Sequence, residues 1–121
     1  MLISVLERLL HTGIIAILRA NQSDKLLPAL DALQAGGVEA MEVTLTTPNA
    51  LDIIAQARAR YGDSLAIGVG SVLDPESARA AISAGAQFVV CPTLNLKTIK
   101  LCRRYSVPVM PGAYTPTEIL T

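Results

Sequence analysis

One carboxylate stands out in this sequence because it lies inside an apolar run. Glu42 is flanked by Met41 and Val43 in the segment 38–45, which has the apolar character of a strand buried in a parallel sheet. Burial raises the pKa of a carboxyl group because the ionised form loses its water. A carboxyl group in this environment can exchange protons near neutral pH, so Glu42 is a candidate general acid and base. A plain buried ion pair with Arg19 is the competing interpretation.

Other polar groups lie where apolar segments end. Arg19 follows the run 13–18 and offers a planar guanidinium for a carboxylate or phosphate, although a solvated residue at a strand edge is the alternative. Strand alternation predicts that Thr44 and Thr46 share a face with the candidate acid, Glu42. The segment 68–71 (Gly-Val-Gly-Ser) permits close approach of a ligand or of backbone. It lacks the third glycine of a dinucleotide site, so a tight turn is the better interpretation.

The remaining reactive side chains indicate no further chemistry. Cys91 ends an apolar strand without a neighbouring basic residue, which favours a packed thiol over a nucleophile. Cys102 has no CxxC spacing to Cys91, and His11 has no partner pattern, so neither a disulfide framework nor a metal site is predicted. No cofactor is implied. This cysteine usage fits the reducing cytoplasm.

The apolar pattern alternates between strand-like and helix-like spacing. Strands are predicted over 13–18, 38–45, 65–69, 88–91 and 107–110, and helices over 2–12, 26–33, 47–57, 74–85, 95–105 and 115–118. Thr47-Pro48, Asp74-Pro75 and Thr115-Pro116 each have the form of a capping residue followed by a first-turn proline. Ser23 or Asp24 could cap the second helix, and Gly36-Gly37 predicts its end.

Two segments resemble one another as helix ends that lead into strands, namely 35–44 and 84–93. Repeated βα units with short loops describe either a doubly wound α/β sheet or part of a (β/α)₈ barrel, and periodicity alone does not choose between them. In both architectures the functional site lies at the carboxyl ends of the strands. The polar residues named above fall at those ends.

The composition of the chain argues against nucleic-acid and membrane partners. The chain has 121 residues, of which 51% are apolar and 17% charged, and we expect residues 1–121 to form a single domain. Ten basic and ten acidic residues cancel and aromatic residues are few, which argues against nucleic-acid binding. Charged residues follow the apolar start too soon for a signal peptide or a membrane span, so no membrane partner is predicted.

Five motifs, in order along the chain, resemble the bacterial 2-keto-3-deoxy-6-phosphogluconate and 4-hydroxy-2-oxoglutarate aldolases. They are Ile-Ala-Ile-Leu-Arg-Ala at 15–20, Glu-Val-Thr-Leu-Thr-Thr-Pro at 42–48, Gly-Val-Gly-Ser-Val-Leu at 68–73, Gly-Ala-Gln-Phe-Val-Val-Cys-Pro at 85–92 and Met-Pro-Gly-Ala-Tyr-Thr-Pro-Thr-Glu at 110–118. The resemblance covers essentially the whole chain. Five ordered strand-end motifs are far more specific than any one of them.

The resemblance implies an α/β fold, a partial (β/α)₈ TIM barrel with an N-terminal helix, about five parallel strands and helices on the outer face. It also implies a cytoplasmic homotrimer that cleaves a 2-keto-3-deoxy sugar acid phosphate, a small-molecule 2-keto acid, to pyruvate and an aldehyde. The family uses a lysine that forms a Schiff base with the keto carbon. Whether the substrate is the phosphogluconate, the hydroxyoxoglutarate or the phosphogalactonate compound is left open.

Family roles transfer to matching positions. Glu42 resembles the general acid and base, and Arg19 the group that holds the pyruvate carboxylate. Thr46 and Ser71 lie alongside, and Pro92 resembles a residue that packs against the keto acid. The family usually has threonine where Ser71 stands, so the hydroxyl is kept and the methyl is lost.

The resemblance also predicts what these residues lack. The family's Schiff-base lysine lies on a sixth strand, whereas Lys25, Lys97 and Lys100 fall in predicted helices. A barrel usually needs about 250 residues, so we expect an N-terminal part of an aldolase that is inactive alone. The alternatives are a non-catalytic half-barrel that pairs its open edges with another chain, and a five-stranded flavodoxin-like binding domain.

Overall fold

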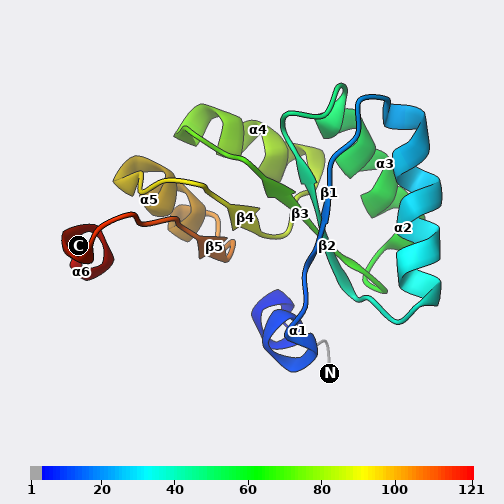
Figure 1. Cartoon of the computed structure of the whole chain (residues 1–121), viewed down its shortest axis with the longest axis horizontal. Helices are drawn as coiled ribbons and strands as arrows, with labels where there is room; N and C mark the ends of the chain where they lie inside the picture. The colour runs from blue at the N-terminus through cyan, green and yellow to red at the C-terminus, as the bar shows by residue number, and fades with distance from the viewer. Residues whose placement is uncertain (1–3) are drawn as a thin grey trace.

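The computed structural model describes residues 4–121, which form a five-stranded parallel sheet whose strands follow one another in chain order (Figure 1). The strands are β1 (Ala16–Leu18), β2 (Ala40–Thr44), β3 (Ala66–Gly70), β4 (Val89–Val90) and β5 (Val109–Met110). The helices are α1 (Val5–Thr12), α2 (Leu26–Ala35), α3 (Ala50–Tyr61), α4 (Pro75–Ala84), α5 (Leu96–Arg104) and α6 (Pro116–Leu120), with a 3₁₀ turn η1 (Ser23–Lys25) before α2. The predicted alternation is confirmed.

Several helix ends follow the predicted local chemistry. The side chain of Asp74 accepts a hydrogen bond from the amide of Ser77, and α4 begins at the next residue, Pro75. Thr115 accepts a hydrogen bond from the amide of Glu118 at the start of α6. Gly37, with φ of 94°, ends the α2 segment in the left-handed region, where glycine meets no steric penalty.

Two predicted helix caps are wrong. Helix α3 begins at Ala50 rather than at Thr47, because the Thr47 hydroxyl accepts a hydrogen bond from the amide of Ala20 instead of capping a helix. Helix α2 has no side-chain cap, because Ser23 and Asp24 lie inside the 3₁₀ turn η1. In both places a tertiary or turn interaction uses the group that the sequence pattern assigned to a cap.

Two apolar clusters lie on opposite faces of the sheet. The larger one packs Met41 and Val43 of β2 against residues of α2 and α3, such as Leu30 and Ile54. It extends under α4 and α5 and holds most of the core. The smaller cluster joins Leu9 of α1 to the opposite face of the strands; its other buried members are Ala40, Ala66 and Phe88. Helix α1 therefore covers the face that α2 to α5 leave free.

The sequential strand order and the placement of α2 to α5 over one face identify the sheet as an arc of a (β/α)₈ barrel (Figure 1). A flavodoxin-like sheet places its second strand outside the first and spreads its helices over both faces. The strand order here is different, so the flavodoxin-like alternative is wrong. The concave face of the arc is the one that carries Glu42, because Glu42 alternates with the outward-facing Met41 and Val43.

Within residues 4–121, no helix is both long and apolar enough to cross a membrane.

Candidate functional site

Glu42 lies on the concave face of β2, with only 3% of its surface exposed. Its neighbours Met41 and Val43 point to the helices, so the alternation predicted from the sequence is confirmed. Burial raises the pKa of the Glu42 carboxyl, and the positive charge of Arg19 opposes that rise in part. The carboxyl is thus set up to hold and release a proton closer to neutral pH than a solvated glutamate does.

Two glycines of β3 make room for this arrangement. A Cβ atom on Gly70 would lie 2.8 Å from the Glu42 carboxyl carbon and 3.3 Å from Oε2, and closer still to Oε1. A Cβ atom on Gly68 would lie 2.5 Å from ring carbons of Phe88, which is fully buried. The acid and the aromatic ring therefore occupy the side-chain positions that β3 leaves empty.

Arg19 directly follows β1 and is exposed. It lines a pocket of about 600 Å³ with Ala20, Asn21 and Gln22 of the loop after β1 and with Lys25 of η1. Glu42 does not line this pocket, and the two side chains form no ion pair within 4.0 Å. The plain buried ion pair considered for Glu42 is therefore absent, although Arg19 is near enough to affect the Glu42 pKa.

Three threonine hydroxyls connect the end of β2 to the loop after β1. Thr44 Oγ1 lies 2.9 Å from Thr46 Oγ1 and 3.4 Å from Thr47 Oγ1. Thr47 in turn accepts a hydrogen bond of 3.3 Å from the amide of Ala20, the residue after Arg19. Thr46 is exposed, so its hydroxyl remains accessible at this end of the sheet, while the buried Thr47 holds the Arg19 backbone in place.

Ser71 and Pro92 follow β3 and the segment 89–91. Ser71 is half-buried and has φ of 59°, a left-handed conformation that is uncommon outside glycine and typical of constrained sites. Pro92 is exposed, and its carbonyl carbon lies where a side chain of Gly112 would be, since a Cβ there would come within 2.5 Å. Both residues lie at the carboxyl ends of strands, as predicted.

Cys91 is buried with Cys102 in the larger cluster, on the helix side of the sheet. Burial, with a smaller contribution from Cys102, raises the pKa of the Cys91 thiol to about 11, which disfavours the thiolate. The packed-thiol interpretation is confirmed. The described residues contain no cluster of three or more His, Cys, Asp or Glu side chains that could hold a metal ion.

The sequence interpretation missed the structural role of three residues on or beside the concave face. Thr47 was assigned to a helix start, and Gly70 and Phe88 were not assigned to the site. The spacing of Gly68 and Gly70 was the available signal, because two glycines on one face of a strand leave space that neighbouring strands fill.

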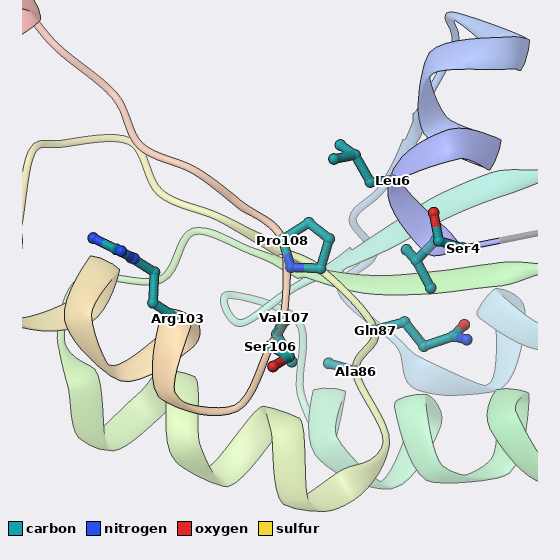
Figure 2. Close-up of a pocket in the computed structure, with 9 residues that line it drawn as sticks. Ser4, Leu6, Ala86, Gln87, Arg103, Ser106, Val107 and Pro108 are labelled. Atoms are coloured by element: carbon teal, nitrogen blue, oxygen red, sulfur yellow. The ribbon is translucent and has the colours of Figure 1, made fainter.

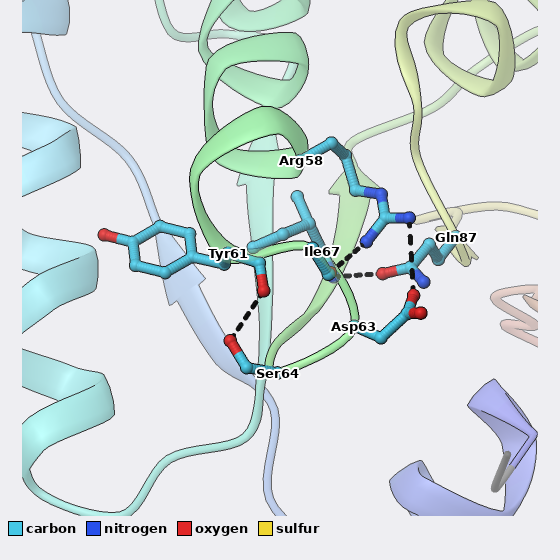
Figure 3. Close-up of polar contacts among 7 residues, drawn as sticks. Arg58, Tyr61, Asp63, Ser64, Ile67 and Gln87 are labelled. Atoms are coloured by element: carbon cyan, nitrogen blue, oxygen red, sulfur yellow. Dashed lines mark hydrogen bonds and ion pairs between the residues drawn. The ribbon is translucent and has the colours of Figure 1, made fainter.

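The opposite, amino-terminal end of the strands carries structural contacts. The Gln87 side chain accepts a hydrogen bond of 3.0 Å from the amide of Ile67, and Ser64 donates to the carbonyl of Tyr61 (Figure 3). Arg58 contacts Asp63 across the same turn. These contacts fix the start of β3, so its glycines at the other end keep their register with Glu42.

Comparison with known proteins places this arrangement in a family. Residues 5–121 match the family model described as KDPG and KHG aldolase. The chain belongs to this aldolase family. It is 37% identical to a 2-dehydro-3-deoxy-phosphogluconate aldolase of Treponema pallidum over 98% of its own residues and 56% of that protein.

Solved members of the family have the same arc. A structure described as native KDPGal superposes with a TM-score of 0.82 at 35% identity, covering 88% of this chain and 52% of that one. A KDPG aldolase from Legionella pneumophila, with pyruvate captured as a covalent carbinolamine, gives a TM-score of 0.81 at 28% identity, covering 88% and 51%. The chain thus spans about half the length of the family members that it matches.

Proposed function

We propose that these residues form the proton-transfer half of a class I aldolase site, which cleaves a 2-keto-3-deoxy acid to pyruvate and an aldehyde. The observation that carries the proposal is the buried carboxyl of Glu42 on the concave face, at the strand ends where barrel enzymes hold their sites. Its raised pKa suits a group that must both accept and donate a proton during carbon–carbon cleavage.

A lysine nucleophile supplies the other half of the proposed chemistry. A carbinolamine, as captured in the Legionella enzyme, forms when an amine adds to the keto carbon of pyruvate. In the present chain Lys25 lies in η1, and Lys97 and Lys100 lie in α5, so none is on a strand. We propose that the reactive lysine comes from the part of the barrel that these residues do not include.

The remaining side chains bind the keto acid in this proposal. Arg19 provides a guanidinium whose planar fork matches the pyruvate carboxylate. The hydroxyls of Thr46 and Ser71 offer further hydrogen bonds at the same end of the sheet, and Pro92 contributes an apolar contact. The proposal includes a homotrimer located in the cytoplasm and no cofactor. It leaves the aldehyde open among gluconate-, glutarate- and galactonate-derived substrates.

Borohydride reduction in the presence of pyruvate tests the proposal. We expect a covalent pyruvate adduct on a protein in which residues 1–121 are followed by the C-terminal half of a related aldolase. The same protein with Glu42→Gln should retain its fold and lose most of the adduct, because proton transfer to the carbinolamine fails. We expect no adduct on residues 1–121 alone. Absence of an adduct on the completed, folded barrel would refute the Schiff-base assignment.

A second candidate follows from the two outer strands of the arc. Ile17 of β1 and Ile14, which lies just before that strand, are exposed, as is Leu10 on α1. At the other end a pocket of about 690 Å³ opens between α1 and the start of β5, where Leu6 faces Pro108 (Figure 2). Sheet edges with adjoining apolar surface are ready to pair with another chain.

The second candidate is therefore a non-catalytic half-barrel that pairs these edges with a second polypeptide. Sedimentation of residues 1–121 distinguishes the cases, because the half-barrel predicts self-association or complex formation. A stable compact monomer over a wide concentration range would contradict it and leave the aldolase proposal unaffected.

A further inference from the structure

The register of β2 and β3 shows an offset between the backbone of Glu42 and its carboxyl group. The Cα of Glu42 pairs with Gly68, and Thr44 pairs with Gly70. The Glu42 carboxyl nevertheless lies over Gly70, since a Cβ there would come within 2.8 Å of its carboxyl carbon. The side chain therefore leans along β3 toward the carboxyl end of the strands, where the barrel site opens.

Phe88 accounts for the direction of this lean. Its ring lies over Gly68, directly across from the Glu42 backbone, and it is fully buried above Leu9 of α1. The ring closes the space toward the amino-terminal end of the concave face. The carboxyl occupies the space over Gly70, on the side of the ring that faces the carboxyl ends of the strands.

Gly70 has no backbone reason to be glycine. Its φ lies outside the left-handed region, whereas the glycines of the chain with positive φ are Gly13, Gly37, Gly62 and Gly85. An alanine would fit its strand conformation and would ordinarily favour a strand. What excludes a side chain at this position is the Glu42 carboxyl itself.

We propose that Gly70 is a positioning residue for the acid and base Glu42. In this proposal the Phe88 ring blocks the amino-terminal side of the concave face, so that the Glu42 carboxyl lies over Gly70. The assignment deepens the proposed aldolase function, because the proton must be delivered at the open end of the strands. A methyl group at position 70 would push the carboxyl off β3 and into the open mouth, where water solvates it.

Titration of the Glu42 carboxyl by carbon NMR in residues 1–121 tests this inference, with Glu42→Gln to identify the resonance. In Gly70→Ala we expect the pKa of Glu42 to fall toward its ordinary value, because solvation replaces burial. The matched control is Gly36→Ala, whose Cβ would meet its nearest atom, the Leu33 carbonyl oxygen, at 3.4 Å and whose φ of −80° suits alanine. We expect that control to leave the Glu42 titration unchanged.

A double variant that enlarges residue 70 and shortens residue 42 distinguishes a positioning role of Gly70 from general damage to the fold. Gly70→Ala should lower the thermal midpoint by roughly 5 to 15 °C, since overpacking a buried site is costly. Adding Glu42→Asp, which shortens the acid by one methylene, should recover a large part of that loss. An unchanged Glu42 titration in a folded Gly70→Ala variant would refute the inference, as would a double variant no more stable than the single one.

The double variant also decides the case in which Gly70→Ala does not fold. Recovery of the fold in Glu42→Asp/Gly70→Ala would then support the assignment, and failure of both variants would count against it. None of these measurements depends on turnover. Failure of the Schiff-base proposal would therefore appear in the borohydride experiment and leave the titration result standing.

Discussion

Arg19 lowers the pKa of Glu42 without forming an ion pair with it. The guanidinium belongs to an exposed residue after β1 and the carboxyl to a buried residue of β2, and the two lie beyond 4.0 Å. A direct ion pair would lower the pKa of the carboxyl further and so favour its ionised form.

Replacing Glu42 by glutamine should stabilise the fold at neutral pH. Because the folded pKa is raised above the ordinary value of 4.5, the unfolded chain releases this proton first as pH rises. The free energy of unfolding therefore falls as pH rises from 4.5 to the raised pKa of Glu42. Each unit by which the pKa is raised corresponds to about 1.4 kcal/mol. In urea unfolding, the free energy of unfolding of Glu42→Gln should exceed that of the unmodified protein at pH 7. The two values should be equal well below pH 4.5. A variant that is less stable at pH 7 would contradict the assigned burial.

Removing the charge of Arg19 should raise the pKa of Glu42 further, since the opposing positive charge is lost. Arg19→Gln and the control Lys25→Gln, which alters the same pocket, can be compared by carboxyl NMR titration. We expect a rise in the first and none in the second. The difference should shrink in high salt because Arg19 is exposed. Equal shifts in the two variants would mean that general charge, not Arg19, acts on the acid.

Tyr61 should contribute to stability through its hydroxyl. The hydroxyl donates to the Asp31 carboxylate at 2.5 Å, which connects α3 to α2, and burial raises the pKa of Tyr61 to about 12. Tyr61→Phe should cost about 1 to 2 kcal/mol at pH 7 in chemical unfolding. The control Tyr105→Phe keeps the ring that stacks with Arg79 at 4.7 Å and should cost little. A smaller loss in Tyr61→Phe than in the control would contradict this role.

Two buried threonines should respond oppositely to valine. Thr98 Oγ1 has no hydrogen-bond partner among residues 4–121, so Thr98→Val should be neutral or stabilising by up to about 1 kcal/mol. Thr47 Oγ1 accepts a hydrogen bond from the amide of Ala20. Thr47→Val should therefore lower the free energy of unfolding by about 1 to 3 kcal/mol, because that amide is left unpaired. Thermal unfolding of the two isosteric variants provides the measurement. Loss of stability in Thr98→Val as large as in Thr47→Val would show that its hydroxyl is satisfied.

Local patterns predicted most of the elements because they depend on neighbouring residues. The apolar spacing placed each helix and strand, and Asp74-Pro75 marked the start of α4 because the cap and the first-turn proline lie within four residues. Thr47-Pro48 has the same local pattern and failed. Its hydroxyl interacts with Ala20, which is distant in sequence, and no local pattern contains that information.

The sequence by itself determined that Glu42 lies in an apolar strand with its neighbours facing the other way, since a two-residue period separates the faces of any strand. Only the tertiary structure decided that the strands follow one another in an arc and that Glu42 faces its concave side. It also decided that the carboxyl lies over Gly70 and apart from Arg19. Such placements depend on how strands from separate βα units pair and twist together, and that pairing is fixed by contacts across the whole sheet.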